Sequence, residues 1–229
     1  MSTHTLADVS VAIAEHRDLL SKHAFLRRLE GSRDIEDLRR FMPHLYFYVF
    51  AFQDMLRLSH ELITEPRLRE IAGRHREEDA GHQHWFVEDA ATLGSSRDVG
   101  WVFGPAHEPT RDISYALVAE VMHAHDDHVR LALPLVLEAV GSTFFFRVND
   151  LIARSGYDGP LRYFSRSHQQ VEADHDIFTA EGSAAINAVE LDEAAYQAAL
   201  AATARCFALF DRLATHLLQH LDDGGLGPA

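Results

Sequence analysis

The sequence has a single cysteine, few basic residues and no long uninterrupted run of apolar residues. Because Cys206 stands alone, the chain can form no intrachain disulfide and no site with several thiolate ligands. Its apolar, helix-forming surroundings predict a buried structural thiol. No segment approaches the roughly 18 apolar residues expected of a membrane span. Residues 1–20 also lack the basic start and apolar core of a secretory signal, so we expect a cytoplasmic protein.

The shortage of positive charge limits the classes of partner. With 21 basic and 35 acidic residues, the formal charge is −14. Nucleic acids and anionic membranes bind to basic patches, so neither is expected as a partner. The length of 229 residues suits one large domain. We therefore predict a single domain over residues 1–229, in which residues 222–229 form a frayed tail.

Helical patterns dominate the chain, and no convincing strand is found. Apolar residues recur with a period near 3.6, and Pro66 suits the first turn of a helix. A break or kink is expected near Pro134. The class is therefore all-α, a single bundle of about seven helices. The predicted helical regions are 6–29, 34–63, 66–93, 112–153 (divided at Pro134), 161–189 and 192–221.

Two segments place histidine and glutamate on one face of a helix. His168, Glu172 and His175 stand at positions i, i+4 and i+7. A helix turns about 100° per residue, so these three side chains share a narrow stripe. An upstream segment has the same residue types at i, i+3 and i+7. Its members are His75, Glu78 and His82.

Glu138 lies in the apolar stretch 135–140. A buried carboxylate is costly unless it is paired or bound to a metal. Iron and manganese accept mixed imidazole and carboxylate ligands, and facing helices can hold them. The sequence therefore predicts a metal centre, through which its ligands would act in catalysis. The predicted ligands are Glu78, His82, Glu138, His168, Glu172 and His175.

Other polar residues are weaker candidates. His75 is a candidate ligand, a partner of a ligand or a surface residue, and Asp79 is expected to be solvated or to support its helix. Glu120 and His123 form a Glu-x2-His pair, a spacing found in ferritin-like di-iron sites. Because polar residues follow it at 125–128, this pair is expected mostly on the surface. Phe144–Phe146 are expected to pack in the core or to line an apolar cavity.

The order of these residues resembles that of the heme-oxygenase-like di-iron oxidases and oxygenases. These all-α proteins are related in fold to heme oxygenase and to the TenA thiaminases. Their pattern is a glutamate and a histidine on one helix, a glutamate on a later helix, and then His-x3-Asp-x2-His. Residues 70–180 follow it, with Glu172 at the position of the aspartate. The cysteine nucleophile of the thiaminases lies mid-chain, whereas Cys206 lies late.

The resemblance implies a heme-oxygenase-like bundle that binds two iron ions, the second weakly, or manganese, with dioxygen as co-substrate. It implies oxidation of a small amino-acid-like or fatty-acid-like substrate by N-oxygenation, C–C cleavage or oxidative decarboxylation. An external electron donor and a homodimer remain open. Two alternatives also remain. One is a ferritin-like or single-metal storage protein, and the other is a heme-binding relative that uses His16 or His23.

Overall fold

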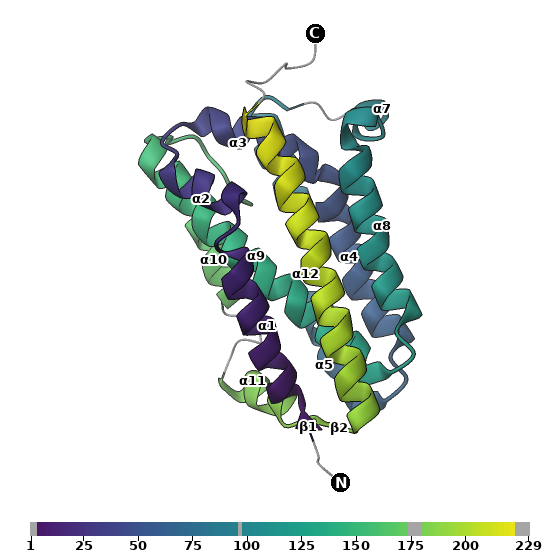
Figure 1. Cartoon of the computed structure of the whole chain (residues 1–229). Coiled ribbons are helices and arrows are strands. Elements are labelled where there is room, and N and C mark those ends of the chain that lie inside the picture. The colour runs from purple at the N-terminus through teal and green to yellow at the C-terminus, as the bar shows by residue number, and fades with distance from the viewer. Residues whose placement is uncertain (1–3, 96–97, 174–179, 223–229) are drawn as a thin grey trace.

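The computed structural model describes residues 4–95, 98–173 and 180–222. Helices make up nearly all of this part, so the predicted all-α class is confirmed (Figure 1). Two short 3-10 helices, η1 (Met42–Leu45) and η2 (Pro105–His107), connect longer elements. The α-helices are α1 (Leu6–Leu20), α2 (Ala24–Gly31), α3 (Ile35–Phe41), α4 (Tyr46–Leu62), α5 (Pro66–Glu78), α6 (His82–Thr92), α7 (Val99–Val102), α8 (Glu108–His123), α9 (Asp127–Ser155), α10 (Arg166–Ala173), α11 (Ala180–Asn187) and α12 (Glu193–Asp222).

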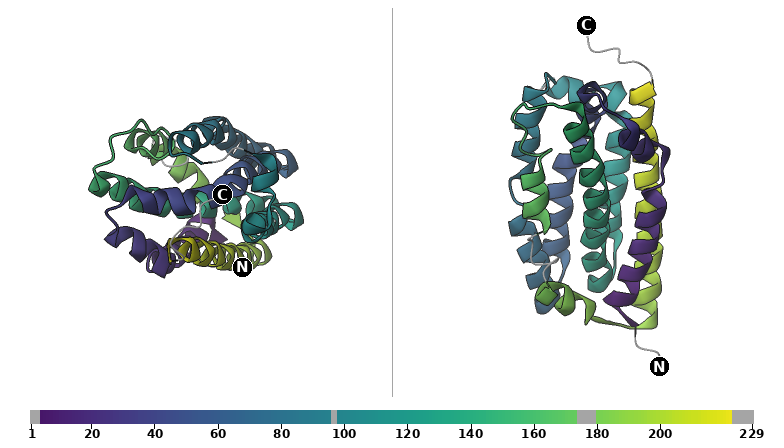
Figure 2. Two further views of the ribbon diagram at one scale, coloured as in Figure 1. Left: turned by 90° about the horizontal axis from the view of Figure 1, so that it is seen from above. Right: turned by 90° about the vertical axis from the view of Figure 1, so that its left-hand side faces the viewer.

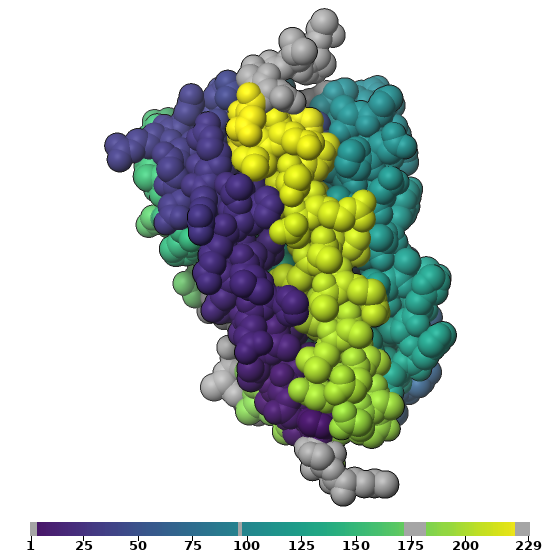
Figure 3. All heavy atoms as spheres, viewed as in Figure 1, coloured from purple at the N-terminus to yellow at the C-terminus, as the bar shows by residue number. Residues whose placement is uncertain are grey.

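The long helices run roughly along one axis and enclose a common core (Figure 2). α4 packs against α5 and α8, and α12 packs against α1, α8 and α9. α1 and α12 lie side by side on one face, where their side chains form a continuous surface (Figure 3). α9 contacts α1, α2, α4, α5, α10 and α12, so it is the central element of the bundle.

α9 is also long and contains an extended apolar stretch. By length and composition alone it could cross a membrane, with a mean hydropathy of 1.6 over its most apolar window. α9 nevertheless contains no unbroken apolar run of the length expected of a membrane span, because Glu138 and Arg147 interrupt it. Half of that window is buried inside the bundle. The central position of α9 accounts for this composition, because a helix packed on several sides needs apolar residues around most of its circumference.

Several predicted helices are divided further than expected. The region 66–93 was predicted as one helix, but α5 ends at Glu78 and α6 begins at His82. Gly81 has φ of 96°, in the left-handed region that glycine adopts without steric cost. The chain therefore changes direction between Glu78 and His82. These two residues do not share one continuous helical stripe.

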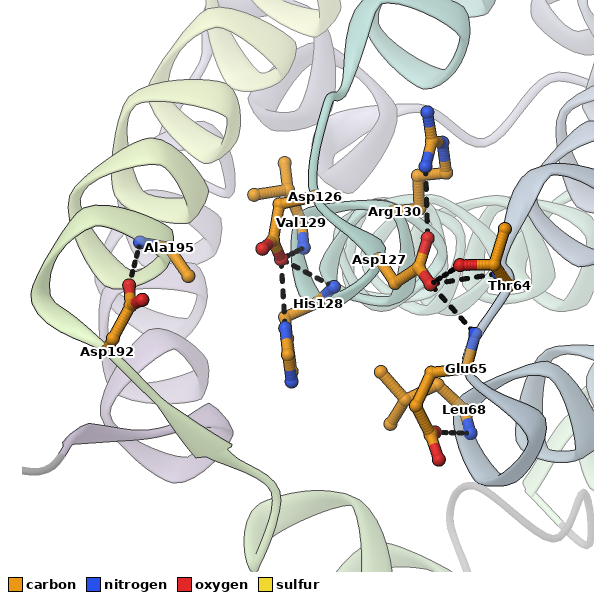
Figure 4. Close-up of polar contacts among 10 residues, drawn as sticks. All are labelled: Thr64, Glu65, Leu68, Asp126, Asp127, His128, Val129, Arg130, Asp192 and Ala195. Carbon is orange, nitrogen blue, oxygen red and sulfur yellow. Dashed lines mark hydrogen bonds and ion pairs between the residues drawn. The ribbon is translucent and has the colours of Figure 1, made fainter.

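The break between α8 and α9 also differs from the prediction. It lies at residues 124–126, and Pro134 is inside α9. The Asp126 carboxylate caps the first turn of α9 by accepting hydrogen bonds from the backbone N–H groups of His128 and Val129 (Figure 4). Capping thus sets the start of α9. Pro134 removes one backbone hydrogen bond from α9, and the packing of α9 against its neighbours offsets this loss.

A short antiparallel pair joins β1 (His4–Thr5) to β2 (Glu190–Leu191), although no strand was predicted. The backbone N–H of Leu6 continues this contact by donating to the carbonyl oxygen of Val189 at 3.0 Å. The pair ties the start of α1 to the segment before α12. Two residues are too few to produce a pattern of period two in the sequence.

Asp127 links two helix starts at one end of the bundle. Its Oδ2 accepts hydrogen bonds from the N–H and hydroxyl of Thr64 and from the N–H of Glu65, at 2.7–2.9 Å (Figure 4). Its Oδ1 pairs with Arg130 at 3.0 Å. Burial raises the pKa of Asp127, but these hydrogen bonds outweigh burial and leave the pKa below its ordinary value. The ionised carboxylate therefore stabilises the turn between α4 and α5.

Asp127→Ala is expected to lower the free energy of unfolding by about 2 kcal/mol, because three donors lose a charged acceptor. The loss should be present at neutral pH. It should shrink as the pH falls below the ordinary range of an aspartate, where the wild-type carboxylate becomes protonated. Urea unfolding at several pH values measures both effects. The matched control is Asp54→Ala, which removes an exposed pair with Arg57 and should cost no more than about 0.5 kcal/mol. Equal losses in both variants would contradict this role for Asp127.

Candidate metal centre

A cavity of about 460 Å³ lies inside the bundle, with walls from α1, α2, α4, α6, α9, α10 and α12. Most of its lining is apolar and includes Phe144 and Phe145. For these two residues, the expectation that the segment lines an apolar cavity is confirmed. Phe146 instead is 53% exposed. Polar and ionisable groups are gathered on part of the wall. They include Asp79, His82, Glu138 and His168.

His75, Asp79 and Glu138 form a buried cluster beside this wall. The Nε2–H of His75 donates to Glu138 Oε1 at 2.7 Å, and Nε2 lies 3.0 Å from Asp79 Oδ2. The three residues are 2%, 2% and 6% exposed. Burial lowers the pKa of His75, but its bonds to Asp79 and Glu138 outweigh burial and raise the pKa to about 10. In the absence of metal, a proton on His75 thus holds the two carboxylates together.

His82 and His168 form the second part of the cluster. His82 Nδ1 lies 3.3 Å from Asp79 Oδ1 and 3.3 Å from His168 Nε2. The Nδ1–H of His168 donates to the carbonyl oxygen of Tyr163 at 2.7 Å, since a carbonyl can only accept. This bond assigns the tautomer of a neutral His168 and leaves Nε2 with a lone pair directed into the cluster.

Asp79 connects the two parts, one oxygen near His75 and the other near His82. Of the two alternatives expected for Asp79, the solvated one is wrong, because Asp79 is 2% exposed. Its backbone forms the C-cap of α5, and its carbonyl oxygen accepts a hydrogen bond from Gln53 of α4 at 3.1 Å. The i, i+4 spacing of His75 and Asp79 indicates that the two side chains lie on the same face of a helix. A single continuous helix through His82 favours Glu78 instead.

Surrounding residues hold the two histidines of α6 and α10 in place. Trp85 stacks on His82 with 4.3 Å between ring centroids, and the guanidinium of Arg162 lies 4.1 Å from the Trp85 ring. Asp89 of α6, 1% exposed, accepts hydrogen bonds from the backbone N–H groups of Arg162 and Phe164. α6 therefore anchors the segment that leads into α10 and carries His168 to the cavity.

The structure brings together four of the candidates from the sequence, namely His75, His82, Glu138 and His168. His75, rated a weaker candidate, is at the centre of the cluster. Glu78 is half-buried at the end of α5, and among the described residues Asp79 rather than Glu78 lines the cavity. Glu172 belongs to α10 by its backbone. Its side chain and the whole of His175 lie outside the described part, so their roles as ligands stay predictions.

The rival pair on α8 lies elsewhere. Glu120 forms a two-pronged ion pair with Arg205 of α12 at 2.8 and 2.7 Å. His123 is exposed at the end of α8, as expected of a surface residue. Neither residue is part of the described cavity wall. Cys206 is 2% exposed, and burial raises the pKa of its thiol to about 12, so the expected structural thiol is confirmed.

The heme alternative depended on His16 or His23 as an axial ligand. His16 stacks on Phe207, with ring centroids 5.2 Å apart. His23 caps α2, where its Nδ1 accepts the backbone N–H of Phe25 at 3.1 Å. Neither histidine belongs to the cavity lining among the described residues. Their contacts therefore give no support to an axial ligand in this cavity.

Comparison with known proteins shows the fold. No family model matches the chain, and no curated protein matches it. The structure is similar to the crystal structure of a domain of unknown function with a heme oxygenase-like fold from Shewanella denitrificans OS217. The TM-score is 0.63, and the 18% identical match covers 98% of this chain and 96% of that chain. The chain therefore has a heme oxygenase-like fold, as the sequence predicted.

In metal-free protein, Asp79→Ala is expected to lower the free energy of unfolding by roughly 3–5 kcal/mol, because a buried imidazolium would lose one of its two carboxylates. Chemical unfolding followed by circular dichroism measures this loss. Glu77→Ala is the matched control, since the exposed carboxylate of Glu77 lies two positions earlier in the same turn of the chain. It should change stability by no more than about 0.5 kcal/mol. If the two variants unfold alike, Asp79 does not hold the cluster together.

Proposed function

We propose that this chain is a non-heme iron oxidoreductase that uses dioxygen to oxidise a small organic substrate bound in the cavity. One observation carries the proposal. A buried cluster of imidazoles and carboxylates forms part of the wall of a mostly apolar cavity. The heme oxygenase-like fold provides the scaffold, and the ligand chemistry provides the argument for a metal.

The cluster fits a metal ion in both geometry and chemistry. Single ligand atoms of His75, Asp79 and Glu138 all lie within 4.8 Å of one another. A divalent ion would replace the proton that His75 now shares with the carboxylates. A mixed set of nitrogen and oxygen ligands suits iron or manganese.

A second ion would bind beside the first. Asp79 presents one oxygen to each part of the cluster and would therefore help to hold both ions. His82 and His168 would then hold the second ion. Glu78, Glu172 and His175 remain the further ligands that the sequence predicts. Bound iron would supply the electrons that reduce dioxygen.

The chain itself would orient the ligands and exclude water. The carbonyl of Tyr163 keeps Nε2 of His168 directed at the cluster. Aromatic side chains on α4, α9 and α12 make the remaining cavity apolar, which keeps water away from reactive species. This enclosure favours the oxidase over a storage protein, whose site would be open to solvent.

The lining also bears on the class of substrate. Gln53, Gln83 and Gln169 provide neutral hydrogen-bonding groups, and no arginine or lysine lines the part of the cavity that the structure describes. Burial and the charge of Glu138 raise the pKa of Tyr48, so its neutral hydroxyl can also donate a hydrogen bond. A substrate with an amine or an apolar body therefore fits this lining better than a free carboxylate, which would need a cationic partner.

Glu138→Ala is expected to weaken iron binding by at least about tenfold and to abolish substrate-dependent consumption of dioxygen, because the cluster loses a charged ligand. Elemental analysis after anaerobic iron loading and an oxygen electrode with a panel of amines measure the two effects. Glu120→Ala is the matched control, because it removes a glutamate that pairs with Arg205 outside the cavity. Iron binding should be unchanged in that variant.

The outcomes distinguish an oxidase from a storage protein and from a chain without a metal centre. Iron binding that is equal in wild type, Glu138→Ala and Glu120→Ala would contradict the metal centre. Tight iron binding that oxidises slowly and at the same rate with every candidate substrate would support storage and contradict the oxidase. Circular dichroism of the metal-free variants must first show the wild-type helical signal.

A further inference from the structure

Four histidines, from η1, η2 and the end of α12, lie in contact with one another. The rings of His44 and His220 stack with 3.4 Å between centroids. His107 stacks on His44 at 4.6 Å, and His216 meets His220 edge to face at 4.7 Å. None of the four belongs to the described lining of the cavity.

The placement of the rings follows from the local structure. His216 and His220 are four residues apart on α12, so both side chains project from the same face. His44 lies in η1, the short helix that follows α3. His107 closes η2, just before α8. Three segments that are distant in the sequence therefore bring imidazoles to one point.

Several ring nitrogens in the group lack a partner among the described residues. They are His44 Nδ1, His107 Nε2 and His216 Nε2, each buried. A buried polar atom without a hydrogen bond costs roughly 1–3 kcal/mol, so such atoms are uncommon unless something else satisfies them. Three such nitrogens at one place favour a bound ligand, such as a metal ion, that accepts nitrogen lone pairs.

The electrostatic environment favours the neutral form of His44, His107 and His216. Burial, together with the neighbouring histidines, lowers the pKa of His44 to about 2. Burial and His220 lower the pKa of His107 and of His216 to about 4. Arg111 also lowers the pKa of His107, so a positive charge lies near that ring. Neutral imidazole is the form that binds metal ions.

We propose that His44, His216 and His220 form a second metal site, for a divalent transition-metal ion such as Zn²⁺. Single nitrogens of these three residues all lie within 4.8 Å of one another. Zinc–nitrogen bonds of about 2.0–2.1 Å require the nitrogens to move closer together and the stacked rings of His44 and His220 to turn, so that their in-plane lone pairs converge on the ion. An all-imidazole set favours zinc, copper or nickel over magnesium or calcium. His107 lies beside the site, next to Arg111, and is not among the three ligands.

The ion would connect η1 to the last turns of α12. It would therefore act as a clamp between the N-terminal third of the chain and the final helix, and this role differs from that of the centre around Glu138. Because the ion binds the folded chain and the three ligands are dispersed in the unfolded chain, binding should raise the melting temperature.

Calorimetric titration of untagged, metal-free full-length protein with Zn²⁺ tests the site, together with thermal unfolding at each ratio of metal to protein. We expect Zn²⁺ to bind and to raise the melting temperature. His44→Phe and His220→Gln should each weaken this binding by at least about tenfold. His82→Gln alters the centre around Glu138 and should leave this zinc binding intact. His125→Gln lies in an exposed loop and should bind zinc like wild type.

The His44 variant distinguishes a built site from simple chelation. If His216→Gln abolishes binding but His44→Phe leaves it unchanged, the ion binds only the pair on α12 and the proposal is wrong. If only His82→Gln loses zinc binding, the zinc binds at the centre around Glu138, and the proposal is also wrong. Because His220 is only half-buried, His220→Gln carries the test if His44→Phe does not fold.

Discussion

The carboxylate of Asp79 is the interaction on which the arrangement of this core depends. It lies between His75 of α5 and His82 of α6, and His75 also bonds to Glu138 of α9. Buried charges are costly unless each one is paired with good geometry. The helices must therefore meet so that these groups stay in contact. Among otherwise apolar residues, this polar contact specifies how α5 and α6 lie against α9.

The turn at 79–81 makes that contact possible. If α5 continued through His82, the helix would present His75, Glu78 and His82 along its own axis. The left-handed Gly81 ends the helix instead, and α6 leaves in a new direction. Asp79 is then the residue at the corner, where its carboxylate faces both histidines. A backbone feature that requires glycine thus decides which carboxylate enters the cluster.

The sequence predicted much of the fold and part of the cluster. Apolar periodicity located the long helices, and the apolar neighbours of Glu138 indicated a buried carboxylate. A single helix over residues 66–93 favours Glu78 over Asp79 as the ligand, and no periodicity in the sequence marks the three-residue interruption at 79–81. Pro134 does not break the helix, because α9 begins earlier, where the carboxylate of Asp126 caps its first turn. The cluster around His44 was missed because its members come from three distant segments, and only tertiary structure brings them together.

The most direct test of the central claim is the position of bound iron. Crystals of iron-loaded protein, with diffraction recorded on both sides of the iron absorption edge, would locate the ion by its anomalous signal. We expect a peak bonded to His75, Asp79 and Glu138, with His75 no longer donating to Glu138. A crystal in which this cluster has no peak and His75 still bonds to Glu138 at hydrogen-bond distance would contradict it.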